Sequence, residues 1–357
     1  MDFSPDGLSL AVADGNGESA IWNVQSGQRL ASLDRRTPAY SIRFSPDGRQ
    51  VATGGDDGVV RVWDSTTGEL LLDLPGHSGN VTSLDFSPDG ELLATASIDG
   101  TTRLWDVGPA GGRERLTVPG HDAVVYSVEF SADGDRLATS SWDRRATIWD
   151  ARTGELLTNI AEHPDSIARI AFRPDGSQVA TAAYDGMVRA WDSASGQLLR
   201  EWTAHGPQDI DVAWDPTGQR LVSGGSDATV KLWDATTGNL LNSLDGHSDR
   251  IHRVAFSPDG RIVASASWDG TARLWLAGSG EPLATLAADG GQVKSVAFSV
   301  DGSRLATAHE DGTRASGAER HHGDAAARAE PRPGRSHRVS LGRCLQSGRR
   351  PSGHPGL

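Results

Sequence analysis

The sequence predicts an all-β fold in which four-stranded antiparallel sheets stack around a common axis. Two observations support this. A motif of the form Phe-Ser-Pro-Asp-Gly recurs along the chain, and only short β-type segments and tight turns lie between its copies. The motif begins at Phe3, Phe44, Phe86, Phe130, Phe172, Trp214, Phe256 and Phe298. The intervals are 41, 42, 44, 42, 42, 42 and 42 residues, so the chain consists of one repeated unit.

Residues 81–106 show the order of elements within one repeat. Ser-Pro-Asp-Gly at 87–90 is a tight turn, because proline fixes φ and glycine accepts a positive φ. An apolar strand over 92–97 leads to a second turn at Asp99-Gly100, and 101–105 form another strand. Thr-Thr-Gly at 66–68 illustrates the third turn, which leads to a strand over 70–74. One such sheet cannot bury both of its faces, so the repeats must stack radially.

The composition predicts a cytoplasmic protein. The chain begins without a signal-like segment and holds no apolar run long enough to span a membrane. Its single cysteine, Cys344, excludes an intrachain disulfide and a multi-cysteine metal site. The net charge is −13, but the last 45 residues (313–357) hold 9 basic and 3 acidic side chains. The acidic excess therefore belongs to residues 1–312.

The repeats resemble the WD-repeat family of β-propellers, in its bacterial type. Gly-His at 76–77, 120–121 and 246–247 carries the resemblance, together with the Ser-Pro-Asp-Gly turns and Trp-Asp at 63–64, 105–106, 149–150, 191–192 and 233–234. It covers residues 1–312 and implies a propeller of seven four-stranded blades, in which the strand over 293–298 completes the first blade. An eight-bladed or open ring is the alternative. The degenerate end repeats indicate a piece of a longer array.

Five Ser/Thr-His-Asp sets raise the question of a hydrolase triad. Each histidine lies 18 residues before a Ser or Thr, 22 before an Asp and 28 before a Trp. Five identical copies in one chain argue for architecture rather than catalysis. The resemblance implies structural tetrads, in which Asp and His link a loop to a turn and Ser/Thr relays the hydrogen bonds to Trp. The tetrads are His77, Thr95, Asp99, Trp105; His121, Thr139, Asp143, Trp149; His163, Thr181, Asp185, Trp191; His205, Ser223, Asp227, Trp233; and His247, Ser265, Asp269, Trp275.

The resemblance also implies where a partner binds: four and six residues before the motif aromatic, and one residue before the tetrad aspartate. These positions give the candidate face Tyr40, Tyr126, Trp142, Tyr184, Arg250, His252 and Trp268. Aromatic side chains with a polar edge are typical interface hot spots, although packing against the next blade is an alternative. Arg250 and His252 beside Trp268 suit an acidic partner segment, with a solvated loop as the alternative.

The predicted function is a non-catalytic scaffold for a protein or peptide partner, with no cofactor and no metal. The residues four before the motif aromatic include Tyr40, Thr82, Ala168 and Lys294, which form no cluster of hard-metal ligands. One alternative is the sensor region of a bacterial signalling protein whose kinase or NTPase lies outside this chain. A propeller enzyme with an active site in the channel is a further alternative.

Residues 313–357 form a predicted disordered basic tail. From Arg314 onward the sequence contains no Phe, Trp, Tyr, Ile or Lys, so it cannot bury a core. Basic arms can bind nucleic acid, but shifting the reading frame by one base restores codons that permit repeat-like residues. We therefore expect a frameshift near residue 313, no nucleic-acid partner, and an exposed edge on the strand over 304–308.

Overall fold

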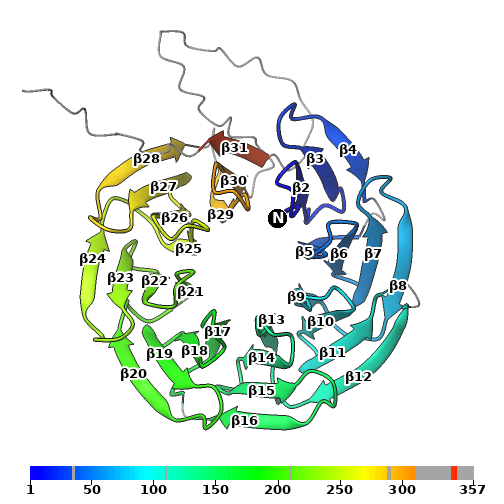
Figure 1. Cartoon of the computed structure of the whole chain (residues 1–357), viewed down its shortest axis with the longest axis horizontal. Coiled ribbons are helices and arrows are strands. Elements are labelled where there is room, and N and C mark those ends of the chain that lie inside the picture. Colours follow the sequence, from blue (N-terminus) through cyan, green and yellow to red (C-terminus); the bar gives the residue numbers. More distant parts are fainter. Residues whose placement is uncertain are drawn as a thin grey trace, which may run out of the picture.

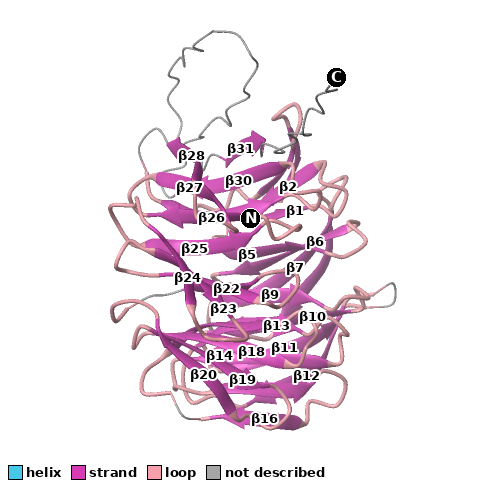
Figure 2. Ribbon diagram, turned by 60° about the vertical axis from the view of Figure 1, so that its left-hand side comes forward, coloured by secondary structure: helices cyan, strands magenta, loops and turns pink. Residues whose placement is uncertain are grey.

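The chain forms a ring of antiparallel sheets around a central opening (Figure 1). The structure, a computed structural model, describes residues 1–33, 37–108, 111–161, 163–208, 211–287, 291–309 and 339–343. Its regular elements are all strands, as Figure 2 also shows. Among the described residues, no helix is long and apolar enough to cross a membrane.

Each sheet is one contiguous stretch of chain, with its first strand at the central opening and its last on the outer rim (Figure 1). The strands of the first four sheets are β1 (Asp2–Phe3), β2 (Ser9–Val12), β3 (Ala20–Asn23), β4 (Arg29–Ser32); β5 (Ala39–Phe44), β6 (Gln50–Gly55), β7 (Val59–Asp64), β8 (Leu70–Pro75); β9 (Val81–Phe86), β10 (Leu92–Ser97), β11 (Thr101–Asp106), β12 (Arg113–Pro119); β13 (Val125–Phe130), β14 (Arg136–Ser141), β15 (Ala146–Asp150) and β16 (Leu156–Ile160).

The next sheets repeat this arrangement. Their strands are β17 (Ile167–Phe172), β18 (Gln178–Ala183), β19 (Met187–Asp192), β20 (Leu198–Thr203); β21 (Asp211–Trp214), β22 (Arg220–Gly224), β23 (Val230–Asp234), β24 (Leu240–Leu244); β25 (Ile251–Phe256), β26 (Ile262–Ser267), β27 (Thr271–Leu276), β28 (Pro282–Ala287); and β29 (Val293–Phe298), β30 (Arg304–His309) and β31 (Val339–Arg343).

The described residues form seven four-stranded antiparallel blades, which confirms the predicted all-β propeller. The ring also holds an eighth, three-stranded sheet of β29, β30 and β31. The predicted closure is wrong: β29 pairs with β30 in its own sheet, because the two residues of β1 already pair with β2 as the innermost strand of the first blade.

The prediction of an exposed edge on β30 is also wrong, because residues 339–343 pair with it as β31. The rest of the predicted disordered tail, 313–338 and 344–357, lies outside the described residues.

The turn between the first and second strands of a blade explains why the Ser-Pro-Asp-Gly motif recurs. In the third blade the Ser87 hydroxyl donates to Asp89 at 2.6 Å and accepts the N–H of Leu92 at 2.9 Å. Gly90 takes a φ of 72°, a left-handed conformation that other residues adopt only at a cost. The motif therefore closes the hairpin and sets the register of both strands.

The apolar core lies between neighbouring blades. One cluster joins Val60, Val62 and Leu74 of the second blade to Leu84 and Trp105 of the third, all with little or no exposed surface. Similar clusters fill the other junctions that the structure describes. Each blade thus buries its faces against its neighbours, so the repeats stabilise one another in sequence order.

Candidate binding face and central channel

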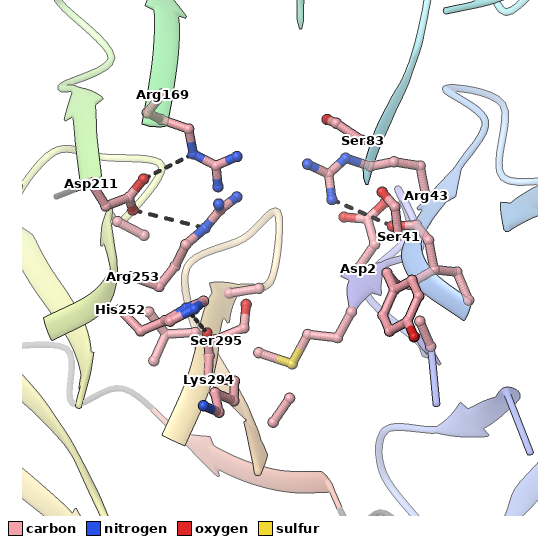
Figure 3. Close-up of a pocket in the computed structure, with 18 of the residues that line it drawn as sticks. Asp2, Ser41, Arg43, Ser83, Arg169, Asp211, His252, Arg253, Lys294 and Ser295 are labelled. Carbon is pink, nitrogen blue, oxygen red and sulfur yellow. Dashed lines mark hydrogen bonds and ion pairs between the residues drawn. The ribbon is translucent and has the colours of Figure 1, made fainter. Parts of the chain in front are cut away.

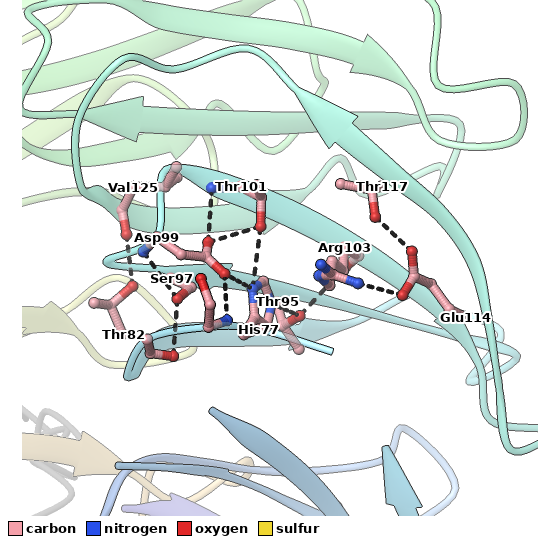
Figure 4. A network of polar contacts seen from close by, with 12 residues as sticks. His77, Thr82, Thr95, Ser97, Asp99, Thr101, Arg103, Glu114, Thr117 and Val125 are labelled. Atoms are coloured by element: carbon pink, nitrogen blue, oxygen red, sulfur yellow. Dashed lines mark hydrogen bonds and ion pairs between the residues drawn. The ribbon is translucent and has the colours of Figure 1, made fainter. Parts of the chain in front are cut away.

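The predicted tetrad of the third blade forms one chain of hydrogen bonds, of which Figure 4 shows His77, Thr95 and Asp99. Nε1 of Trp105 donates to the hydroxyl of Thr95 at 2.9 Å, and that hydroxyl lies 2.8 Å from Nε2 of His77. Nδ1 of His77 lies 3.0 Å from a carboxylate oxygen of Asp99. A neutral imidazole with its proton on Nδ1 satisfies every group in this chain. The tetrad therefore joins the loop before the blade to the turn between its second and third strands.

Three other predicted tetrads have the same histidine contacts. His121, His205 and His247 lie 2.8–2.9 Å from the carboxylates of Asp143, Asp227 and Asp269, and 2.7–2.8 Å from the hydroxyls of Thr139, Ser223 and Ser265. Trp233 donates to Ser223 at 3.0 Å, whereas Trp149 donates to Thr147 at 2.7 Å and more weakly to Thr139 at 3.4 Å. Trp275 packs edge-on against the ring of His247.

The fifth blade departs from the expected pattern. Nε2 of His163 contacts Thr181 at 2.8 Å, and Trp191 donates to the same hydroxyl at 2.9 Å. Asp185 instead accepts a 2.7 Å bond from Nη2 of Arg189, which leaves Nδ1 of His163 buried and without a partner among the described residues. Burial lowers the pKa of His163 to about 3. The expected bond between His163 and Asp185 is therefore wrong for this blade.

The tetrad hydroxyls cannot act as nucleophiles on a substrate from solution. Ser265, Ser223, Thr95 and Thr139 have no exposed surface. Burial lowers the pKa of His247, and contact with Asp269 offsets only part of that effect. The imidazole is therefore neutral at neutral pH and serves as a bridge inside the blade.

Trp142, on the turn between β14 and β15, contacts two of the other candidate aromatic side chains. The ring of Trp142 stacks on Tyr126 with centroids 6.2 Å apart, and meets Tyr184 edge-on at 6.3 Å. Trp142 nevertheless keeps 44% of its surface exposed. We call these three residues the aromatic ridge. It spans the fourth and fifth blades, so it is a composite surface that no single repeat provides.

A second group surrounds Trp268. The guanidinium carbon of Arg250 lies 4.1 Å from the centroid of the Trp268 ring, and Nζ of Lys294 lies 4.0 Å from it. Nδ1 of His252 lies 2.8 Å from the backbone oxygen of Lys294 in the next sheet. We call Arg250, His252, Trp268 and Lys294 the basic cluster. The cation–π contacts hold two positive charges against a single indole ring.

Both groups border the same central cavity, which has a volume of about 960 Å³. Tyr126 of the aromatic ridge lines it, as do His252 and Lys294 of the basic cluster. Tyr40, 56% exposed, lines it from the second blade. Three of the seven candidate positions, Tyr40, Tyr126 and His252, thus line the cavity. The other four join them only through the ring contacts given above. We call the seven positions together the channel-mouth face.

Deeper in the channel lies a layer of charged side chains that the sequence analysis missed. Arg43, Arg169, Asp211 and Arg253 line both the large cavity and a neighbouring cavity of about 460 Å³, so they mark the waist between them (Figure 3). Arg169 bonds to Asp211 at 2.9 Å. The available signal was a charged residue one or three positions before the motif aromatic, on the innermost strand of the repeat.

Carboxylates of the innermost strands also link neighbouring blades. Asp85 accepts the N–H of Phe130 at 2.9 Å, and Glu129 accepts that of Phe172 at 3.1 Å. Burial raises the pKa of Asp85 to about 6 and, together with the nearby Asp85 carboxylate, that of Glu129 to about 8. At neutral pH Glu129 is therefore mostly protonated and contributes little negative charge to the channel.

Comparisons with known proteins agree with this architecture. The WD40 family model (WD domain, G-beta repeat) matches residues 27–64, 68–106, 112–150, 154–192, 196–234, 238–275 and 280–313. Among solved structures, the crystal structure of the computationally designed Ika8 protein matches at 28% identity with a TM-score of 0.77, covering 86% of this chain and 92% of that one. A comparison with curated proteins finds no match. The repeated turns, the tetrads and the matched residues together establish that this chain belongs to the WD40 repeat family.

Proposed function

We propose that this chain is a non-catalytic scaffold that binds a protein or peptide through its channel-mouth face. WD40 propellers commonly mediate protein interactions. The observation that carries the proposal for this chain is the aromatic ridge, because Trp142 is exposed although two tyrosines fix its orientation. A side chain whose conformation is already fixed loses little conformational entropy on binding, and such preorganised aromatic residues are typical of interface hot spots.

The basic cluster indicates the chemistry of the partner. Arg250 is positioned against Trp268, and His252 contacts the backbone of Lys294. Guanidinium and ammonium groups fixed on an aromatic ring suit carboxylates of a partner segment. We therefore propose a partner that presents an apolar or aromatic side chain to the aromatic ridge and an acidic side chain to the basic cluster, and we place the complex in the cytoplasm.

A peptide-display selection against the immobilised chain tests this function. Peptides that bind the wild type should lose roughly 30-fold in affinity for Trp142→Ala, the effect typical of a hot-spot truncation. The matched control is Leu199→Ala, which removes an exposed apolar side chain from the outer strand β20. Selected peptides that bind Trp142→Ala as tightly as the wild type, but fail on Leu199→Ala, would contradict the proposal.

A further inference from the structure

We infer that the waist of the central channel binds a small polyanion, a molecule that carries two or more carboxylate or phosphate groups. The inference rests on the charged layer below the channel-mouth face and does not depend on the proposed partner. Arg43 on β5, Arg169 on β17 and Arg253 on β25 come from three different blades. In Figure 3, Arg169 and Arg253 reach into the cavity from one side and Arg43 from the other.

The charge balance of the cavity favours an anion. The lining of the larger cavity carries the side chains of Arg43, Arg169, Arg253 and Lys294 against those of Asp2 and Asp211. The smaller cavity adds the carboxyl groups of Asp85 and Glu129, of which Glu129 is mostly protonated at neutral pH. This excess of positive charge occurs in a chain whose net charge is −13. The positive potential is therefore confined to the cavity. The protein around the cavity has a low dielectric constant, which concentrates the electric field at the waist.

The acidic groups on both sides of the waist already serve the fold, since Asp85 and Glu129 of the smaller cavity accept N–H groups of neighbouring blades. One oxygen of Asp211 bonds to Arg169 at 2.9 Å, and the other accepts the N–H of Val254 at 2.9 Å and lies 3.9 Å from Arg253. Asp2 accepts the N–H of Phe44 at 2.8 Å. The single carboxylate of Asp211 thus lies beside two guanidinium groups, those of Arg169 and Arg253. These two groups therefore keep N–H donors that can bind a ligand in the cavity.

The shape of the site suits a small molecule rather than an acidic protein. A volume of about 960 Å³ lies within the usual range for ligand cavities, roughly 300–1,000 Å³. Planar guanidinium groups match both carboxylate and phosphate oxygens in a two-pronged geometry. A macromolecule with a large net negative charge would be repelled by the acidic chain, which a partner with a single acidic side chain at the mouth would not be. A small anion needs to enter only the positive channel.

Isothermal titration calorimetry with citrate and with inorganic pyrophosphate tests the inference. We expect one site per chain for at least one of these ions, with an affinity that falls as salt is added. Tighter binding of citrate would assign a carboxylate ligand, and tighter binding of pyrophosphate a phosphate ligand. Absence of binding by both ions to the folded wild type would overturn the inference.

Substitutions locate the site. Arg43→Gln should weaken binding roughly tenfold, as expected for loss of a charge-assisted contact, and Arg43→Lys should weaken it less because the charge remains. Arg261→Gln is the matched control, because it removes the same charge from an exposed turn where Arg261 is 80% exposed. Circular dichroism and the unfolding midpoint verify the fold of each variant. Equal weakening by Arg43→Gln and Arg261→Gln would refute the waist as the site.

Discussion

Replacing His247 by alanine measures what a complete tetrad contributes to stability. The change removes contacts of 2.8 Å to Asp269 and 2.7 Å to Ser265. Asp269 keeps its bonds from Thr271 and from the N–H of Ser248, but the fully buried Ser265 loses its acceptor. The neutral bond to Ser265 is worth about 1 kcal/mol and the charge-assisted bond to Asp269 about 2 kcal/mol, so the expected loss beyond the packing cost is roughly 3 kcal/mol.

His163→Ala is the matched comparison, because it deletes the same ring from an incomplete tetrad. Here the wild type already has an unpartnered Nδ1, and only the 2.8 Å contact with Thr181 is lost. We expect a loss of about 1 kcal/mol beyond the packing cost that both variants share. The difference of roughly 2 kcal/mol between the two variants should appear as a difference in their urea unfolding midpoints, measured by tryptophan fluorescence. Equal shifts for the two variants would refute the idea that the histidine–aspartate bond stabilises the blade.

Other predictions test the channel, the turns and the tail. Burial and the Asp85 carboxylate raise the pKa of Glu129 from 4.5 to about 8, so the folded state binds a proton that the unfolded state releases, and stability should fall as pH rises through that interval. Between pH 5 and pH 9, the free energy of unfolding of Glu129→Gln, measured with urea, should therefore rise by about 2 kcal/mol relative to that of the wild type. This figure is lower than the full pKa shift implies, because Glu129 is only half-buried. Equal pH slopes for the two proteins would contradict the prediction. Gly186→Ala should cost at least about 2 kcal/mol, because an added Cβ would clash with the backbone oxygen of His205 at a φ of 81°. Gly27→Ala, with open space at a φ of 67°, should cost only the conformational penalty of about 1–2 kcal/mol. Equal losses in the two variants would show that the clash is relieved. Resequencing the gene should reveal a one-base shift near codon 313, and an unchanged frame would refute the frameshift hypothesis.

The repeat made much of the fold predictable. Turn residues and strand residues recur at fixed offsets, so the strands of one blade, such as 92–97 and 101–106, predict those of the next. The closure was not predictable in this way, because it depends on whether two residues, Asp2 and Phe3, suffice to form an inner strand. The competition between β1 and the distant β29 for the inner edge of β2 decides that question, and it leaves no periodic signal.

The candidate site, like the fold, was only partly predictable from the sequence. The histidine spacing correctly brings His77 to Thr95 and Asp99, since every blade repeats the geometry. The spacing could not reveal that Asp185 turns to Arg189, because the competing cation lies within the same hairpin and wins by its charge. The arginines of the waist converge from blades far apart in sequence, so only the closed ring shows that they face one cavity.

The contiguity of each sheet has an evolutionary consequence. Because no described strand is exchanged between blades, duplication of one segment of about 42 residues would add a whole blade with its turns and tetrad intact. Loss of such a segment would remove one blade just as cleanly. Recombination within the gene can therefore change the diameter of the channel in single steps, and with it the number of side chains that reach the centre.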